Sequence, residues 1–119
     1  MKTTKIQISA LQRFNLTQIL PAEASYSEMI LKTDISQKVQ LSQVEQTKFI
    51  ERKNDLEFFN AAGISEKKEI PFSELEINFI KKTLRELDGK KKINDQTAQL
   101  YKIFCIDFNE NNFKNSDEK

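Results

Sequence analysis

Apolar residues recur at spacings of three and four most regularly over residues 72–108, which predicts two helices joined by a short turn. Ser73 and Glu76 form a capping box at the start of the first helix, which should stop at Gly89 before a lysine run. Asn94 or Asp95 can cap the second helix. The predicted apolar stripes consist of Ile77, Ile80, Leu84 and Leu87, widened by Leu75 and Phe79, and of Thr97, Tyr101, Phe104, Cys105 and Phe108. These two faces should pack on each other.

The chain before this segment predicts a short edge strand, two more helices and a helical segment of one or two turns. Polar and apolar residues alternate over residues 5–8, which favours the strand, and Pro21 should end the helix that follows. Serine residues suited to capping precede each helical stretch, two of them within capping boxes. Helix starts are predicted at Ser9 with Gln12, at Ser25 or Ser27, and at Ser42 with Glu45.

Residues 49–60, FIERKNDLEFFN, predict a β-hairpin around Asn54 and Asp55, because both residue types tolerate the positive φ of a two-residue turn. The next residues, AAGISEKK, are interpreted as a surface loop. Ile70 and Phe72 alternate on a further strand, and Pro71 places that strand at a sheet edge because it lacks a backbone donor.

The combined pattern predicts an α+β fold: a single helix-rich domain with about four helices and a short antiparallel β-hairpin or three-stranded sheet. This globular domain is expected over residues 1–108, and the residues of 109–119, which lack periodicity, are expected to form a flexible C-terminal tail. The order helix, helix, short helix and hairpin also fits a winged-helix-like arrangement.

Composition argues against several classes of function. The chain has 119 residues with 19 basic and 18 acidic side chains, and a net charge of +1 creates no general attraction to nucleic acid or anionic membranes. Histidine is absent, which removes the commonest general base and transition-metal ligand. Two glycines are too few for a dinucleotide or phosphate-binding loop. We therefore expect no enzyme activity, no catalytic residue, no cofactor and no small-molecule substrate.

The single cysteine and the absence of long apolar runs bear on location. Cys105 cannot form an internal disulfide, and its place on an apolar stripe predicts a packed, unreactive thiol. No segment reaches the length of a membrane span. The expected location is the cytoplasm, without a membrane partner.

Three stretches of the sequence resemble a group of small uncharacterised bacteriophage proteins: LTQILPAEASYSEMILKTDI at residues 16–35, KEIPFSELE, and IKKTLRELDGKKKI followed by LYKIF. In that group an ILP-like helix end precedes a second helix, and a lysine-rich turn precedes an LYxxF-like end. The resemblance extends to about Phe108 and implies a phage or prophage source, hence the host cytoplasm. It implies no activity and no site.

The C-terminus contains a pattern similar to a calcium loop, with Asp107, Asn109, Asn111 and Glu118 at positions one, three, five and twelve. Asn112 replaces the glycine of position six, and only two of the four candidate ligands carry a carboxylate. A solvated, asparagine-rich tail without a metal site is therefore the favoured interpretation.

The predicted hairpin contains the candidate partner-binding residues. Phe58 and Phe59 are neighbours on a strand, so they should point to opposite faces. Two outcomes stay open: one aromatic ring is left available for contact, or a flanking helix or loop covers both. Ile64 in the next loop would extend such an apolar patch, and Arg52 and Lys53 are the basic residues beside it. We therefore predict a non-enzymatic, phage-type accessory protein that binds a host factor, a phage protein or a second copy of itself.

The alternative prediction is a winged-helix-like DNA-binding regulator, in which residues 42–48 form the recognition helix. That segment contains Glu45 and only one cation, Lys48, whereas helices that read bases are usually rich in arginine and lysine.

Overall fold

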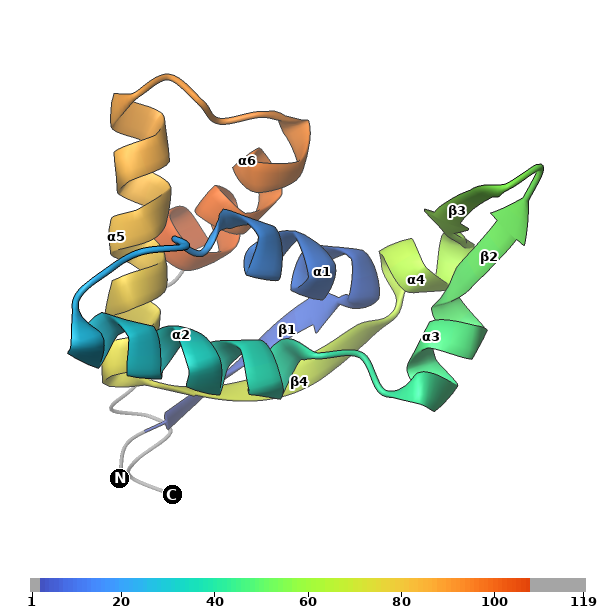
Figure 1. The fold of residues 1–119 in the computed structure, drawn as a ribbon, viewed down its shortest axis with the longest axis horizontal. Coiled ribbons are helices and arrows are strands. Elements are labelled where there is room, and N and C mark those ends of the chain that lie inside the picture. The colour runs from blue at the N-terminus through green and yellow to red at the C-terminus, as the bar shows by residue number, and fades with distance from the viewer. Residues whose placement is uncertain (1–2, 108–119) are drawn as a thin grey trace.

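The computed structural model describes residues 3–107, in which helices and two small antiparallel sheets combine in an α+β fold (Figure 1). The predicted fold class is confirmed. Within the described residues there are six α-helices, a terminal π-helical segment and four strands, so helices outnumber the expected four. In chain order the elements are β1 (Thr3–Ser9), α1 (Ala10–Ile19), α2 (Tyr26–Val39), α3 (Gln43–Phe49), β2 (Ile50–Lys53), β3 (Leu56–Phe59), α4 (Ala61–Ser65), β4 (Lys67–Ser73), α5 (Glu74–Gly89), α6 (Asp95–Tyr101) and η1 (Lys102–Asp107).

The strands pair as two separate two-stranded antiparallel sheets, and not as one sheet of three strands. β1 pairs with β4 over its whole length, from Thr3 opposite Ser73 to Ser9 opposite Lys67, and β2 pairs with β3 in the hairpin. Pro71 lies opposite Lys5 in a sheet that has only edge strands, as its missing N–H requires. The N-terminal strand β1 is thus paired with β4, which follows the hairpin and α4 in the chain.

The predicted capping residues are the observed ones. Ser9, Ser42 and Ser73 each cap a helix and form a complete capping box with the residue three positions later. Ser25, and not Ser27, caps α2, and Asn94 caps α6. Asn54 and Asp55 have φ angles of 53° and 65°, which is the conformation that a type I′ hairpin turn demands.

The core lies between the β1–β4 sheet, α1, α2, α5 and α6. Ile77, Ile80 and Leu84 of α5 are fully buried in it, as the stripe predicted. Leu75 is 67% exposed, so its predicted place on the stripe is wrong; it belongs to the first turn and faces solvent. Cys105 is half-buried against the core, and Phe108 lies outside the described residues.

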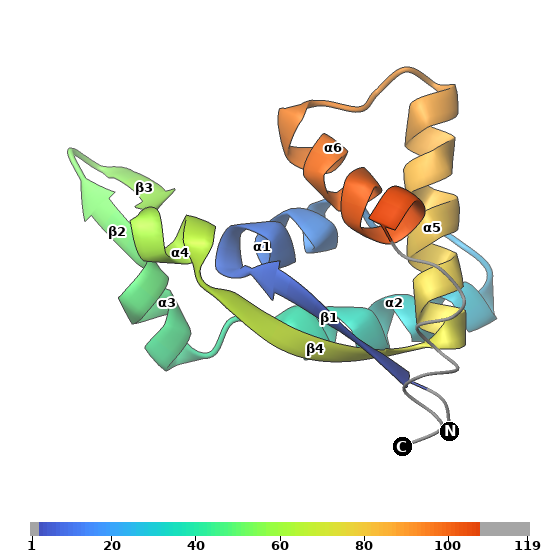
Figure 2. The same ribbon diagram turned by 180° about the vertical axis from the view of Figure 1, so that it is seen from behind.

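One end of the molecule is a projecting unit made of α3, β2, β3 and α4, here called the hairpin lobe (Figures 1 and 2). The segment interpreted as a surface loop contains the helix α4, whose cap is the Asn60 side chain. Gly63 of α4 is buried against α3, where an added Cβ would lie 3.0 Å from the Phe49 carbonyl oxygen. α1 packs against this lobe through α4, and against α2 and α6 on its other sides.

Candidate functional site

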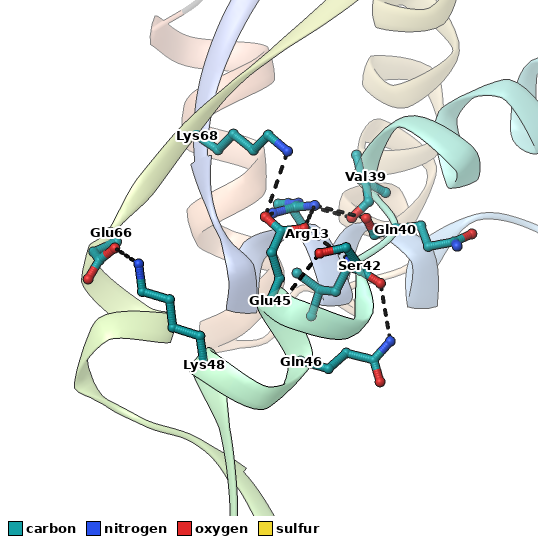
Figure 3. Close-up of polar contacts among 10 residues, drawn as sticks. Arg13, Val39, Gln40, Ser42, Glu45, Gln46, Lys48, Glu66 and Lys68 are labelled. Carbon is teal, nitrogen blue, oxygen red and sulfur yellow. Dashed lines mark hydrogen bonds and ion pairs between the residues drawn. The ribbon is translucent and has the colours of Figure 1, made fainter.

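A buried arginine fixes the hairpin lobe to the rest of the fold (Figure 3). Arg13 of α1 is 2% exposed, and its guanidinium donates to both carboxylate oxygens of Glu45 in α3, at 2.8 and 3.1 Å. Its Nε also donates to the Val39 carbonyl at 3.0 Å, and one terminal nitrogen to the Gln40 carbonyl at 2.9 Å. One side chain therefore joins α1, the end of α2 and the start of the lobe.

Glu45 also completes the capping box at the start of α3. One of its carboxylate oxygens accepts the Ser42 backbone N–H of the α3 capping box at 3.0 Å, and Lys68 of β4 lies 3.7 Å from the other. The hydrogen bonds from Arg13 are the main cause that lowers the pKa of the Glu45 carboxyl from its usual 4.5 to about 2, against the opposing effect of burial. Glu45 is therefore ionised at every physiological pH.

α1 exposes an aromatic ring and buries polar side chains beside its apolar Leu16, which departs from an ordinary amphipathic helix. Arg13 and Asn15 are buried, whereas Phe14 between them is 46% exposed. The bonds of Arg13 set the rotation of the helix, and successive residues are about 100° apart around a helix axis. Phe14 consequently lies beside the hairpin, with its ring centroid 5.7 Å from that of Phe59.

Phe14 and the hairpin line a hollow of about 500 Å³, here called the α1–hairpin groove. Five of its eight lining residues are apolar or aromatic, and Glu57 is the charged one among these described residues. The lining residues are Leu11, Phe14, Asn15, Ile50, Glu57, Phe58, Phe59 and Gln96. An apolar surface with a few polar groups is typical of a site that binds another molecule.

The groove continues along α1 toward the turn between α5 and α6. A second hollow of about 420 Å³ shares Phe14, Asn15 and Gln96 with the first, and its lining also includes Lys92 and Asn94. The lysine run of this turn thus contributes one residue to the far end of the same surface.

The predicted partner-binding residues separate into two groups. Phe58 is 44% exposed, whereas Phe59 is half-buried and its ring lies beside that of Phe14. Both line the α1–hairpin groove. Ile64 in α4 is 54% exposed, and it does not line the groove.

Arg52 and Lys53 are exposed on β2 and do not line the groove either. Arg52 lies opposite Glu57 in the hairpin, and their side chains form an exposed ion pair at 3.6 Å. The sequence analysis did not single out Phe14 or Leu11 as candidate site residues. Nothing local in the sequence marks Phe14, because adjacent residues lie about 100° apart on a helix and an exposed Arg13 beside a buried Phe14 would be the ordinary arrangement.

A larger hollow of about 720 Å³ lies where α5 begins, beside Leu31 and Leu75. Its buried charge is already paired, because Glu76 accepts the Lys38 ammonium at 2.6 Å and the Ser73 backbone N–H at 2.8 Å. Glu76 is thus a capping and ion-pairing residue, as its position in the first turn predicts.

The other residues considered for catalysis or metal binding do not form a site in the described part of the chain. Burial raises the pKa of the Cys105 thiol, opposed by the positive charges of Arg85 and Lys81, so the unreactive protonated form prevails. Residues 3–107 contain no cluster of three or more metal-ligating side chains. Asn109, Asn111 and Glu118 of the calcium-loop-like pattern, and the predicted tail of residues 109–119, lie outside the described residues. No helix in the described part of the chain is long and apolar enough to cross a membrane.

Comparison with known proteins gives no relative: no protein-family model, no curated protein and no solved structure matches this chain.

Proposed function

We propose that this protein is a non-enzymatic accessory protein that binds another protein through the α1–hairpin groove. The observation that carries the proposal is the exposure of Phe14 and Phe58 on two different elements that line one apolar hollow. Exposed aromatic residues grouped around a concavity are typical of protein contact sites. The sequence resemblance to phage proteins would make the partner a host factor or a protein of the same phage.

The hairpin lobe is well suited to such a role because it is held rigidly. The buried Arg13–Glu45 pair at 2.8 Å fixes α3, and α3 continues into β2 at Ile50 without a linker. Asn60 reinforces the base of the hairpin, since its side chain donates to the Lys48 carbonyl at 2.8 Å and to Glu51 at 2.9 Å. A preorganised surface loses less conformational entropy when it binds.

Site-specific photocrosslinking in the cells that express the protein tests this proposal. A photoreactive phenylalanine analogue at position 58 should give a covalent adduct with one defined protein, whereas the same analogue at Leu75, an exposed residue away from the groove, should not. The purified partner should then bind the wild-type chain and lose about tenfold or more in affinity for Phe58→Ser. Equal adducts at both positions, or none at position 58, would contradict the proposal.

DNA binding is the second candidate, favoured by the short helix α3 that leads directly into a hairpin with Arg52 and Lys53 near its tip. Charge counts against it. Residues 42–68 contain five basic and five acidic side chains, and Lys48 is paired with Glu66 at 3.2 Å. A shift of duplex DNA at low salt that weakens steeply as salt rises would support this candidate, and no shift at low salt would remove it.

A further inference from the structure

The free edge of β3 forms one wall of the α1–hairpin groove. Three consecutive residues of this strand, Glu57, Phe58 and Phe59, line the groove. Because successive side chains of a strand point to opposite faces, a hollow that touches three in a row also reaches the main chain or the edge of the strand. The groove therefore adjoins main-chain groups as well as side chains.

The hydrogen-bonding pattern of the hairpin leaves those main-chain groups unpaired. In a hairpin with a two-residue turn, the pair that flanks the turn is hydrogen-bonded and such pairs then alternate. Lys53 pairs with Leu56, and Asn60 N donates to the Phe49 carbonyl at 2.9 Å, as the alternation requires. The N–H and C=O groups of Glu57 and Phe59 therefore point away from β2.

Nothing in the described part of the chain occupies this edge. The hydrogen bonds of residues 3–107 outside the helices and ladders include none to the main chain of Glu57 or Phe59. On the opposite edge, by contrast, the Ile50 N–H is already bonded to the Gln46 carbonyl at the end of α3. β3 is thus open at both of its outward-facing residues, and open edges are templates for strand addition.

We infer that the partner segment binds as an extended strand that pairs with β3, and that it has the pattern apolar, basic, apolar, apolar in either chain direction. This inference rests on the proposed function. The residue opposite Glu57 would be lysine or arginine, since Glu57 is the charged side chain among the described residues that line the groove. Glu57 forms an exposed ion pair with Arg52 at 3.6 Å. Exposed pairs contribute little to stability, so a cation of the partner can replace Arg52 at small cost.

The apolar positions follow from the neighbours of the added strand. Residues opposite Leu56 and Phe58 would cover side chains that are 70% and 44% exposed. The residue opposite Phe59 would point to the other face, where Phe14 and Leu11 complete the groove. Main-chain bonds supply affinity in this mode of recognition, and the alternating pockets supply specificity.

A second copy of the chain is a poorer occupant. A two-fold antiparallel pairing of β3 with itself would set Glu57 against its own copy or against Phe59, and neither arrangement provides a cation. Like charges placed directly opposite each other in a sheet are destabilising.

A library of short peptides displayed on yeast, selected against the full chain, tests the inference. Selected peptides should contain the apolar–basic–apolar–apolar pattern, and selection against Glu57→Lys should replace the basic residue by aspartate or glutamate. Addition of a selected peptide should slow hydrogen exchange of the Glu57 and Phe59 amides by about tenfold or more, with little change at Phe58, whose amide is already paired. The matched control is Lys53→Ala on β2, which should leave peptide affinity within about twofold of wild type.

The outcomes of these experiments distinguish failure of strand addition from failure of the proposed function. Peptides that require Phe14 and Phe58 but leave the Glu57 and Phe59 amides unprotected would overturn strand addition and keep a groove that binds protein. A helical pattern among the selected peptides would overturn it in the same way. A concentration-dependent dimer that protects these amides without peptide would overturn the choice of occupant. If selection yields no peptide that depends on the groove, strand addition is overturned, and the crosslinking experiment then decides the proposed function separately.

Discussion

Arg13 and Glu45, 32 residues apart in the chain, form a two-point ion pair with nitrogen–oxygen distances of 2.8 and 3.1 Å. The guanidinium is almost completely buried, and its remaining bonds go to the carbonyl groups of Val39 and Gln40. The pair decides both how α1 is rotated and where the hairpin lobe sits. The candidate site therefore depends on a contact that lies beneath it.

Removal of the guanidinium should be strongly destabilising. Arg13→Met leaves the Glu45 carboxylate and the carbonyl groups of Val39 and Gln40 without their donor, and breaking a buried pair in this way costs about 3–5 kcal/mol. Chemical denaturation followed by circular dichroism measures the loss. The control is Arg52→Ala, which removes an exposed pair and should cost about 1 kcal/mol or less. Equal effects of the two substitutions would refute the role assigned to Arg13.

Stability should fall in acid through Glu45. The folded-state pKa, about 2, is below the usual value of 4.5, so the contribution is fully present above about pH 4.5 and is lost as the pH falls toward 2. A shift of this size in a mostly buried group corresponds to roughly 3 kcal/mol. Unfolding free energies measured between pH 2 and 7 should show this decline in the wild type. In Glu45→Gln the curve should be flatter, and parallel curves would contradict the prediction.

Gly63 should tolerate no side chain. In Gly63→Ala the new Cβ would lie 3.1 Å from the Cβ of Phe49 and from a ring carbon of Phe59, which are both anchored in the lobe. Overpacking of this kind costs about 1–3 kcal/mol. Gly89 is the matched control, because a Cβ there meets nothing within 4 Å and its φ is not positive. Gly89→Ala should be neutral or stabilising by up to about 1 kcal/mol in thermal unfolding.

Glycine at the second position of the turn should stabilise the hairpin. Asp55 has a φ of 65°, which costs a residue with a Cβ about 1 kcal/mol, and Asp55→Gly removes that cost. Hydrogen exchange of the β2–β3 amides should slow in this variant. Asp55→Val should accelerate it, because a branched Cβ opposes positive φ. Exchange that is unchanged in both variants would show that the turn does not limit hairpin stability.

Local features of this fold were readable from the sequence. The capping boxes at Ser9, Ser42 and Ser73 involve residues three positions apart, and the hairpin turn needs only Asn54 and Asp55. The helix α4 was missed because it has five residues and no apolar period, so only its cap, Asn60, could have indicated it. The pairing of β1 with β4 was missed because the two strands are more than 50 residues apart, and neither strand's sequence specifies which strand it pairs with.

Sequence reasoning alone was enough to place the helix ends, the hairpin turn and the apolar stripe of α5, because these depend on backbone propensities and on side chains within one or two turns of each other. It also indicated the two phenylalanines of the hairpin. Phe14 joins them only through the packing of the folded chain. That outcome depends on the rotation of α1, which is fixed by Arg13 through bonds to residues that lie 26 to 32 positions further along the chain.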